Sequence, residues 1–156
     1  MAANEVTRAR ADTFAMMFIV TQQLTRRADR ELAHLGISTR QWLLLAVVKQ
    51  GFGGGPVRLG AVAAAYGTSR QNVKQIALQL ESRGYLELRP DPDDARALLL
   101  EATPKVAVFD APAERRRQGR FFRDILAGFA EADVQQLHEL LRAWHRMLVD
   151  ESASSM

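Results

Sequence analysis

Residues 59–80, which read LGAVAAAYGTSRQNVKQIALQL, carry the strongest structural signal in the chain. Two short helices joined by a tight turn need a small residue where they cross and a turn residue that tolerates positive φ. Ala63 and Gly67, four residues apart, meet these two needs. The apolar residues that would lock the second helix against the first are Val62, Tyr66, Val73, Ile76 and Leu80. The stretch therefore predicts a helix-turn-helix, with an ordinary helical hairpin in a core as the alternative.

The exposed face of the second helix, at about 69–83, has the composition of a DNA-reading surface. If its apolar residues point inward, helical geometry turns the polar ones outward. These outward residues are Arg70, Gln71, Lys74, Gln75 and Gln79. Arginine and glutamine can read guanine and adenine edges in the major groove, and lysine can contact phosphate. Each residue taken singly is an ordinary solvated side chain, but the only acidic residue of this helix, Glu81, lies near its far end.

Upstream of this motif, the sequence predicts two more helices. Apolar or small residues recur at steps of three and four over 7–35, which indicates one face of a long helix. A second helix should begin at Ser38, because Ser38 and Gln41 have the spacing of a capping box. Thr68 and Gln71 repeat that spacing, although Ser69 is an equally good cap for its helix. Residues 42–48 are apolar on every side, so the second helix is expected to be the buried centre of the fold.

Downstream, the pattern predicts a hairpin and then two helices. Alternating residues at 85–89, a Pro-Asp turn at 90–94 and an apolar run at 97–100 indicate a two-stranded hairpin. Thr103-Pro104 reads as an N-cap with proline at the first helical position. That helix should run to about 127–129 with an interruption at Pro112, and a last helix should occupy about 131–149. The predicted fold class is mainly α with a small β-hairpin.

The hairpin region resembles a known family. It reads RGYL at 83–86 and RPDPDDAR at 89–96, followed by Leu98, Leu100 and Thr103. This Asp-x-Arg with alternating apolar residues and a threonine resembles the wing signature of the MarR family of bacterial transcription regulators. The segments GIS-x-x-QW at 36–42 and LAGF at 126–129 resemble the start of the family's second helix and its last interhelical loop.

The resemblance implies a winged helix-turn-helix homodimer whose first, fifth and sixth helices interlock. It also implies that Asp94 braces the wing by pairing with Arg96 or a nearby backbone group, and that Arg96 enters the minor groove. The predicted DNA interface comprises Thr68, Ser69, Arg70, Gln71, Lys74, Gln75, Gln79, Arg89, Asp94 and Arg96. The corresponding division is a dimerisation helix at 1–37, a DNA-binding domain at 38–103, dimerisation helices at 104–150 and a disordered tail at 151–156.

The outer helices carry two further candidate surfaces. Residues at a and d spacing on the last helix predict a dimer seam, with packing on the long first helix as the alternative. These residues are Val134, Leu137, Leu141, Trp144 and Leu148. The resemblance also suggests a pocket for a small aromatic or anionic effector, although a residue of this kind is more often plain core than a pocket wall. The candidate walls are Phe14, Met17, Phe18, Trp42, Phe121 and Phe122.

The charge of the chain favours a nucleic-acid partner but is not enough by itself to identify one. The net charge is only +3, yet 18 of the 21 basic residues are arginine, which suits bidentate contact with phosphate and guanine. A cluster of arginines follows Pro112, at positions 115, 116, 117, 120 and 123. Phosphate contact, a solvated helix face and ion pairs with a partner chain all remain open for this cluster.

Several functional classes lack support in the residues. The chain has 156 residues and no cysteine, which removes disulfides, thiolate metal sites and cysteine nucleophiles. His138 and His145 are seven residues apart, roughly 10 Å along a helix, too far to share one metal ion. The glycines at 51–55 lack the lysine and Ser/Thr of a phosphate-binding loop. No membrane span or signal peptide is evident. We therefore expect a cytoplasmic non-enzyme with no metal and no cofactor.

The sequence thus predicts a regulator that binds double-stranded DNA at a pseudo-palindromic operator as a homodimer. Repression relieved by a small molecule is the expected mode. The alternative is a winged-helix module for protein–protein assembly without DNA contact, which would not be expected to gather Arg70, Lys74, Arg89 and Arg96 on one face.

Overall fold

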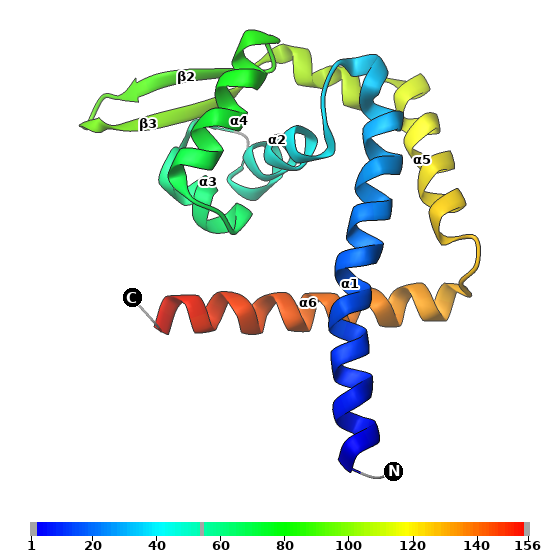
Figure 1. The fold of residues 1–156 in the computed structure, drawn as a ribbon. Helices are drawn as coiled ribbons and strands as arrows, with labels where there is room; N and C mark the ends of the chain where they lie inside the picture. The colour runs from blue at the N-terminus through cyan, green and yellow to red at the C-terminus, as the bar shows by residue number, and fades with distance from the viewer. Residues whose placement is uncertain (1–2, 54, 155–156) are drawn as a thin grey trace. The chain divides into compact units, whose positions relative to one another are not determined.

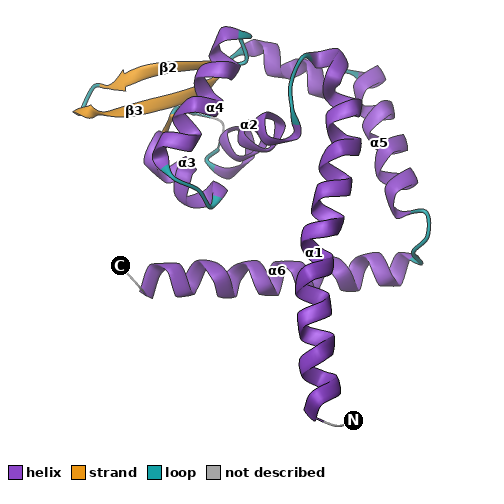
Figure 2. Ribbon diagram, viewed as in Figure 1, coloured by secondary structure: helices purple, strands orange, loops and turns teal. Residues whose placement is uncertain are grey.

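The computed structural model describes residues 3–53 and 55–154 (Figure 1). The chain divides into two compact units, Met1–Ala111 and Pro112–Met156. Helices predominate, with one small sheet in the first unit (Figure 2). The elements in chain order are α1 (Ala3–Leu32), the 3-10 helix η1 (Ala33–Leu35), α2 (Thr39–Gly51), β1 (Val57–Arg58), α3 (Leu59–Tyr66), α4 (Arg70–Ser82), β2 (Leu86–Asp91), β3 (Asp94–Ala102), the 3-10 helix η2 (Pro104–Asp110), α5 (Pro112–Leu126) and α6 (Glu131–Ser154).

Helix α1 covers most of the predicted 7–35 helix but is displaced from it at both ends. It begins at Ala3 and gives way to η1 after Leu32. Gly36 closes η1 in the left-handed conformation, with φ 69°, and its N–H donates to the carbonyl of Ala33. The chain therefore reverses at a glycine, which adopts this conformation without the steric cost of a side chain.

The middle of α1 presents apolar side chains on more than one side. Phe14 and Phe18 lie on the predicted apolar face, with their rings edge to face at 5.0 Å. Met16 and Ile19 lie off that face, and all four side chains are 55–60% exposed. Large apolar groups left exposed on several sides of one helix mark it as a candidate contact surface.

Helix α2 begins as predicted and is buried less completely than predicted. The capping box is present: the N–H of Gln41 donates to the Ser38 hydroxyl, and the N–H of Ser38 donates to Gln41 Oε1. Leu44, Leu45 and Val48 are buried in the core. Leu43 is 43% exposed, so the expectation of burial on every side is wrong. Helices α1, α3 and α4 and strand β3 contact α2, but they leave Leu43 partly open to solvent.

The helix-turn-helix is confirmed. Gly67 ends α3 in the left-handed conformation with φ 72°, which the turn between α3 and α4 requires. The cap of α4 is Ser69, whose hydroxyl accepts from the N–H of Asn72. The predicted locking residues are buried except Tyr66, which is half-buried and donates its hydroxyl to the carbonyl of Arg40. Burial raises the pKa of Tyr66.

The sheet has three antiparallel strands where the sequence predicted two. The hairpin pairs Leu86 with Ala102 through to Pro90 with Leu98. A third strand, β1, adds to the other side of β3 and pairs Val57 with Leu100. The sequence signal was too short to indicate a strand of two residues. By tying β3 to the start of α3, β1 anchors the wing beside the helix-turn-helix.

The second unit contains α5 and α6. Pro112 starts α5, so the predicted interruption is present, and the segment before it is the 3-10 helix η2, capped by Thr103. Helix α6 continues to Ser154, past the expected end at about 149. Residues 151–154, predicted to be disordered, are helical, and 155–156 lie outside the described residues. Within the part of the chain that is described, no helix is long and apolar enough to cross a membrane.

Candidate nucleic-acid interface

Helix α4 presents the predicted polar face to solvent. Val73, Ile76, Ala77 and Leu80 are buried against the core. All five residues expected to point outward are exposed. Leu78 is exposed as well, on the same side as Gln71 and Gln75, although the sequence analysis did not include it. The exposed face of α4 can therefore reach base edges through polar and apolar groups.

A groove of about 720 Å³ lies between the start of α4, the start of α3 and the wing. Its charged lining residues are four cations, Arg58, Arg70, Lys74 and Arg96, against the single acid Asp94. The rest of the lining is mostly small or apolar. A concave surface with this excess of positive charge attracts a polyanion such as a nucleic-acid backbone.

One flank of α4 lies close to the start of α3. The guanidinium of Arg70 crosses Gly60, and a Cβ placed on Gly60 would lie 3.2 Å from Arg70 Nε. Any larger residue at position 60 would displace the Arg70 side chain. The glycine thus leaves room for Arg70 at the bottom of the groove.

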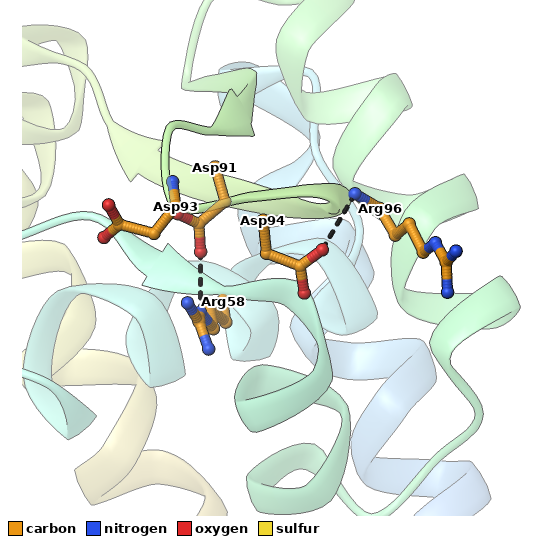
Figure 3. A network of polar contacts seen from close by, with 5 residues as sticks. All are labelled: Arg58, Asp91, Asp93, Asp94 and Arg96. Atoms are coloured by element: carbon orange, nitrogen blue, oxygen red, sulfur yellow. Dashed lines mark hydrogen bonds and ion pairs between the residues drawn. The ribbon is translucent and has the colours of Figure 1, made fainter.

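An ion pair that the sequence analysis missed ties the wing to β1 (Figure 3). Arg58 Nε donates to Asp91 Oδ2 at 2.6 Å, and the N–H of Asp93 donates to Asp91 Oδ1 at 2.9 Å. Asp91 is buried while Arg58 is largely exposed. The two residues are 33 positions apart and no spacing in the sequence links them. The pair fixes the base of the turn beside the groove.

Arg96 lies at the tip of the wing in an irregular stretch of β3. Pro90 pairs with Leu98 and Asp91 pairs with Asp94, so residues 95–97 bulge out of the ladder. The N–H of Arg96 donates to Asp94 Oδ1 at 3.0 Å, and the Arg96 side chain extends away from that carboxylate (Figure 3). Asp94 therefore holds the Arg96 backbone, one of the two forms of bracing that the resemblance implied, and leaves the guanidinium projecting from the turn.

The pKa of Asp91 is shifted, and this shift makes the stability of the fold depend on pH. Its pKa lies below the usual value, first because the Asp93 N–H donates to the carboxylate and also because Arg58 pairs with it, while burial opposes the shift. A carboxyl group whose pKa is lower in the folded chain stabilises the fold above its unfolded pKa and loses that contribution as pH falls through the folded value.

We expect Asp91→Asn to flatten the acid side of the stability profile. The parent should lose thermal stability more steeply than the variant below about pH 4, and the variant should be the less stable protein near pH 7. Asp93→Asn, which changes an exposed neighbour, is the matched control and should follow the parent. Thermal unfolding followed by circular dichroism between about pH 3 and pH 7 measures this. Parallel curves for parent and Asp91→Asn would contradict the assignment.

Comparison with known proteins agrees with this geometry. Residues 35–97, which span α2 to the wing bulge, match the model of the MarR family. The similarity to the MarR family therefore covers the helix-turn-helix and most of the wing. A curated relative, the transcriptional activatory protein BadR of Rhodopseudomonas palustris, is 24% identical over 136 residues, or 86% of this chain and 77% of the relative. Members of the MarR family are transcriptional regulators and not enzymes.

Solved structures of the MarR family share the fold. A MarR protein from Peptoclostridium difficile superposes with a TM-score of 0.76 at 15% identity, covering 90% of this chain and 89% of that one. A mutant of MarR from E. coli, solved in complex with operator DNA, has a TM-score of 0.69 at 17% identity, covering 83% of this chain and 90% of that one. At these identities the likeness establishes the fold.

Three other residues of the predicted MarR-type interface have partners within the chain. Arg89 pairs with Glu101 across the hairpin at 2.9 Å. Thr68 accepts a hydrogen bond from the Asn72 side chain, and Gln79 accepts one from Gln41. Their side chains are therefore held in place before any ligand binds.

The predicted effector walls are divided between the two units. Trp42 packs against the core of the first unit, Phe14 and Phe18 contact each other on α1, and Met17 is half-buried there. Phe121 and Phe122 contact each other on α5, in the second unit. None of these residues lines the groove or the smaller hollow of about 300 Å³ on α6.

The helices of the second unit expose the predicted seam. Leu137, Leu141 and Leu148 are 41–53% exposed on α6, whereas Val134 and Trp144 are half-buried. In the α5 arginine cluster, Arg117 is half-buried and the other four are exposed. His138 and His145 both line the hollow on α6. Among the described residues, no group of three or more His, Cys, Asp or Glu is placed to hold a metal ion.

Proposed function

We propose that this protein is a MarR-family regulator and binds a pseudo-palindromic operator as a homodimer. The groove between α4 and the wing supports this proposal most directly, because Arg70, Lys74 and Arg96 line it. Arg58 lines it as well but pairs with Asp91, and Asp94 is the only acidic lining residue among those that the structure describes. In this arrangement α4 enters the major groove, and the wing lies along the duplex. Two copies related by a two-fold axis would place their α4 helices about 10–11 base pairs apart.

Each exposed residue has a distinct role in the proposed complex. Gln71 and Gln75, on the side of α4 opposite its buried face, read base edges. Arg70 and Lys74 line the groove and contact phosphates. Arg96 projects from the wing bulge into the minor groove, where a narrow groove concentrates negative potential.

Dimerisation would use the helices at the two ends of the chain. The exposed apolar residues of α1 and α6 form faces suited to burial, and a second copy of this chain is the proposed occupant. Residues 1–37 and 104–150 then serve as dimerisation segments, and 38–103 as the DNA-binding domain. This division keeps the groove and the wing within one segment.

The proposed regulation is repression relieved by a small aromatic or anionic molecule. Without cysteine, thiol oxidation cannot be the signal. The relative BadR is named an activatory protein, which is the opposite direction of regulation. A reporter gene fused to the bound promoter, compared with and without the regulator, distinguishes the two: expression should rise when the regulator is absent, and a fall would reverse the sign.

Two substitutions on α4 test the proposed roles by contrast. Lys74→Ala should weaken binding to all duplexes similarly and make the log–log salt dependence shallower by about one for each bound subunit. Gln75→Ala should change the preference at one or two base pairs, by about 1–3 kcal/mol if the side chain makes a bidentate adenine contact. Salt-titrated binding to matched and scrambled duplexes measures both. If both variants bind like the parent, this face of α4 is not the DNA surface and the assembly-module alternative takes over.

A further inference from the structure

Gln41 is a buried residue in the first turn of α2, and its side-chain amide is hydrogen-bonded on both sides. Its Oε1 accepts from the N–H of Ser38 at 3.0 Å, which completes the capping box. Its Nε2 donates to Gln79 Oε1 on α4 at 2.8 Å. Gln41 is 5% exposed, whereas Gln79 is exposed. A cap at the start of one helix therefore contacts a side chain on the exposed part of another.

The polarity of these contacts follows from the backbone. A backbone N–H can only donate, so the atom of Gln41 that faces Ser38 must be its oxygen. The amide nitrogen of Gln41 must then face α4, and Gln79 must meet it with its own oxygen. The outward polar atom of Gln79 is consequently Nε2, which has hydrogens to donate. No rotation of the Gln79 amide can exchange the two atoms without losing the bond to Gln41.

We propose that Gln41 is a positioning residue for DNA binding, which holds Gln79 as a donor to a phosphate oxygen of the DNA backbone. This inference rests on the proposed function and assigns a contact within it. A glutamine that reads adenine needs both its oxygen and its nitrogen, and the oxygen of Gln79 is already occupied. Phosphate oxygens only accept, so they match a side chain that offers only N–H groups.

The place of Gln79 on α4 points to the same ligand. Gln79 is eight residues after Gln71. Around the axis of α4 it therefore lies about 80° from Gln71, the residue that would face the base edges of the DNA major groove. That rotation brings it toward Ile76 and the start of α2, on the flank away from the wing. Phosphates border the major groove on both sides of a helix that enters it. Arg70 and Lys74 would meet one border, and Gln79 the other.

A double-mutant cycle separates this polarity from simple packing. Gln41→Glu keeps the capping box, because a carboxylate also accepts from the Ser38 N–H. Its second oxygen faces α4 and can only accept a hydrogen bond. Gln79 must therefore turn its nitrogen inward and its oxygen outward, toward the DNA. Gln79→Met removes the amide altogether. The four proteins are the parent, the two single variants and the double variant, and the probe is a duplex selected from a random-sequence pool for binding to the parent.

We expect each single variant to bind this duplex roughly a hundredfold more weakly, since the dimer loses two hydrogen bonds to charged groups. The double variant should bind like Gln79→Met, because no amide is left for the introduced carboxylate to reorient. If Gln41→Glu weakens binding equally in both backgrounds, its charge is the cause and the inference fails. If the parent binds and Gln79→Met binds equally well, the inference also fails while the proposed function stands. If the parent selects no duplex, the proposed function itself fails.

A second measurement identifies the contacted group without relying on Gln41→Glu. In this measurement, single phosphates of the duplex are replaced by neutral methylphosphonates. At one position in each half-site, the replacement should weaken DNA binding by the parent and leave DNA binding by Gln79→Met unchanged. Gln79 is exposed, so its replacement removes no side chain from the core, and the partner it takes away is that of the Gln41 amide nitrogen. Identical interference patterns for the two proteins would overturn the phosphate contact. A base pair whose substitution affects only the parent would assign Gln79 to a base edge instead.

Discussion

A chain that ends at Ala130 is expected to be monomeric or insoluble and to bind operator DNA about 10²- to 10⁴-fold more weakly. The loss follows because two linked half-site contacts become independent when the dimer separates. The deletion removes α6, whose exposed leucines form the proposed seam, and the apolar residues of α1 would then stay exposed in the monomer. Light scattering gives the oligomeric state, and titration of a two-half-site duplex gives the affinity.

A point substitution tests the same seam in a full-length chain. Leu141 is 47% exposed in the single chain, so Leu141→Glu should leave the fold intact and prevent dimerisation by placing a charge in an apolar interface. Ala143→Glu adds the same charge about 160° around α6, at another exposed position, and should remain dimeric. A dimer with Leu141→Glu, or a soluble, well-folded dimer after the deletion, would place the interface elsewhere.

Arg96→Ala is expected to lower operator affinity roughly a hundredfold. A dimer loses two wing guanidiniums, and each charge-assisted contact contributes about 1.5 kcal/mol. The loss should be larger on duplexes with A-tract flanks than on G·C-rich ones, because the narrow A-tract minor groove has the more negative potential. Preferences at the central base pairs should change little. Competition binding with the two flank types measures both effects.

Two further variants separate the wing contact from net charge. Arg8→Ala removes the same charge from an exposed position on α1 and should have little effect on either flank type. Arg96→Lys retains the charge without the planar guanidinium and should recover part of the affinity. Equal losses for Arg96→Ala and Arg8→Ala would show that Arg96 acts only through the overall field of the protein.

Local features of this fold could be predicted from the sequence because each depends on neighbouring residues. The Ser38–Gln41 capping box, the left-handed Gly67 and the buried face of α4 all follow from spacings of three or four residues. Pro112 interrupts the helical segment for the same local reason, since a helix interior cannot accommodate it.

Features that join distant segments could not be predicted in this way. Strand β1 has two residues, and its partners on β3 are distant in the sequence. The Arg58–Asp91 pair depends on that strand, so it was missed as well. The Gln41–Gln79 bond joins two residues that the spacing assigned to separate roles, a cap and a DNA contact. The burial expected around residues 42–48 failed at Leu43 because apolar character alone does not say which neighbours are present.

The exposed apolar middle of α1 has a consequence for how the protein is made. The segment around Phe14 and Ile19 leaves the ribosome well before α6, which begins only at Glu131. At about 5–20 residues per second, more than a hundred residues take several seconds to synthesise. During that time the proposed seam on α6 has not yet been made, and a second chain must still be met by diffusion. Rapid synthesis at high cellular concentration should therefore shorten this interval, whereas slow or dilute expression should favour aggregation or chaperone capture of the nascent helix.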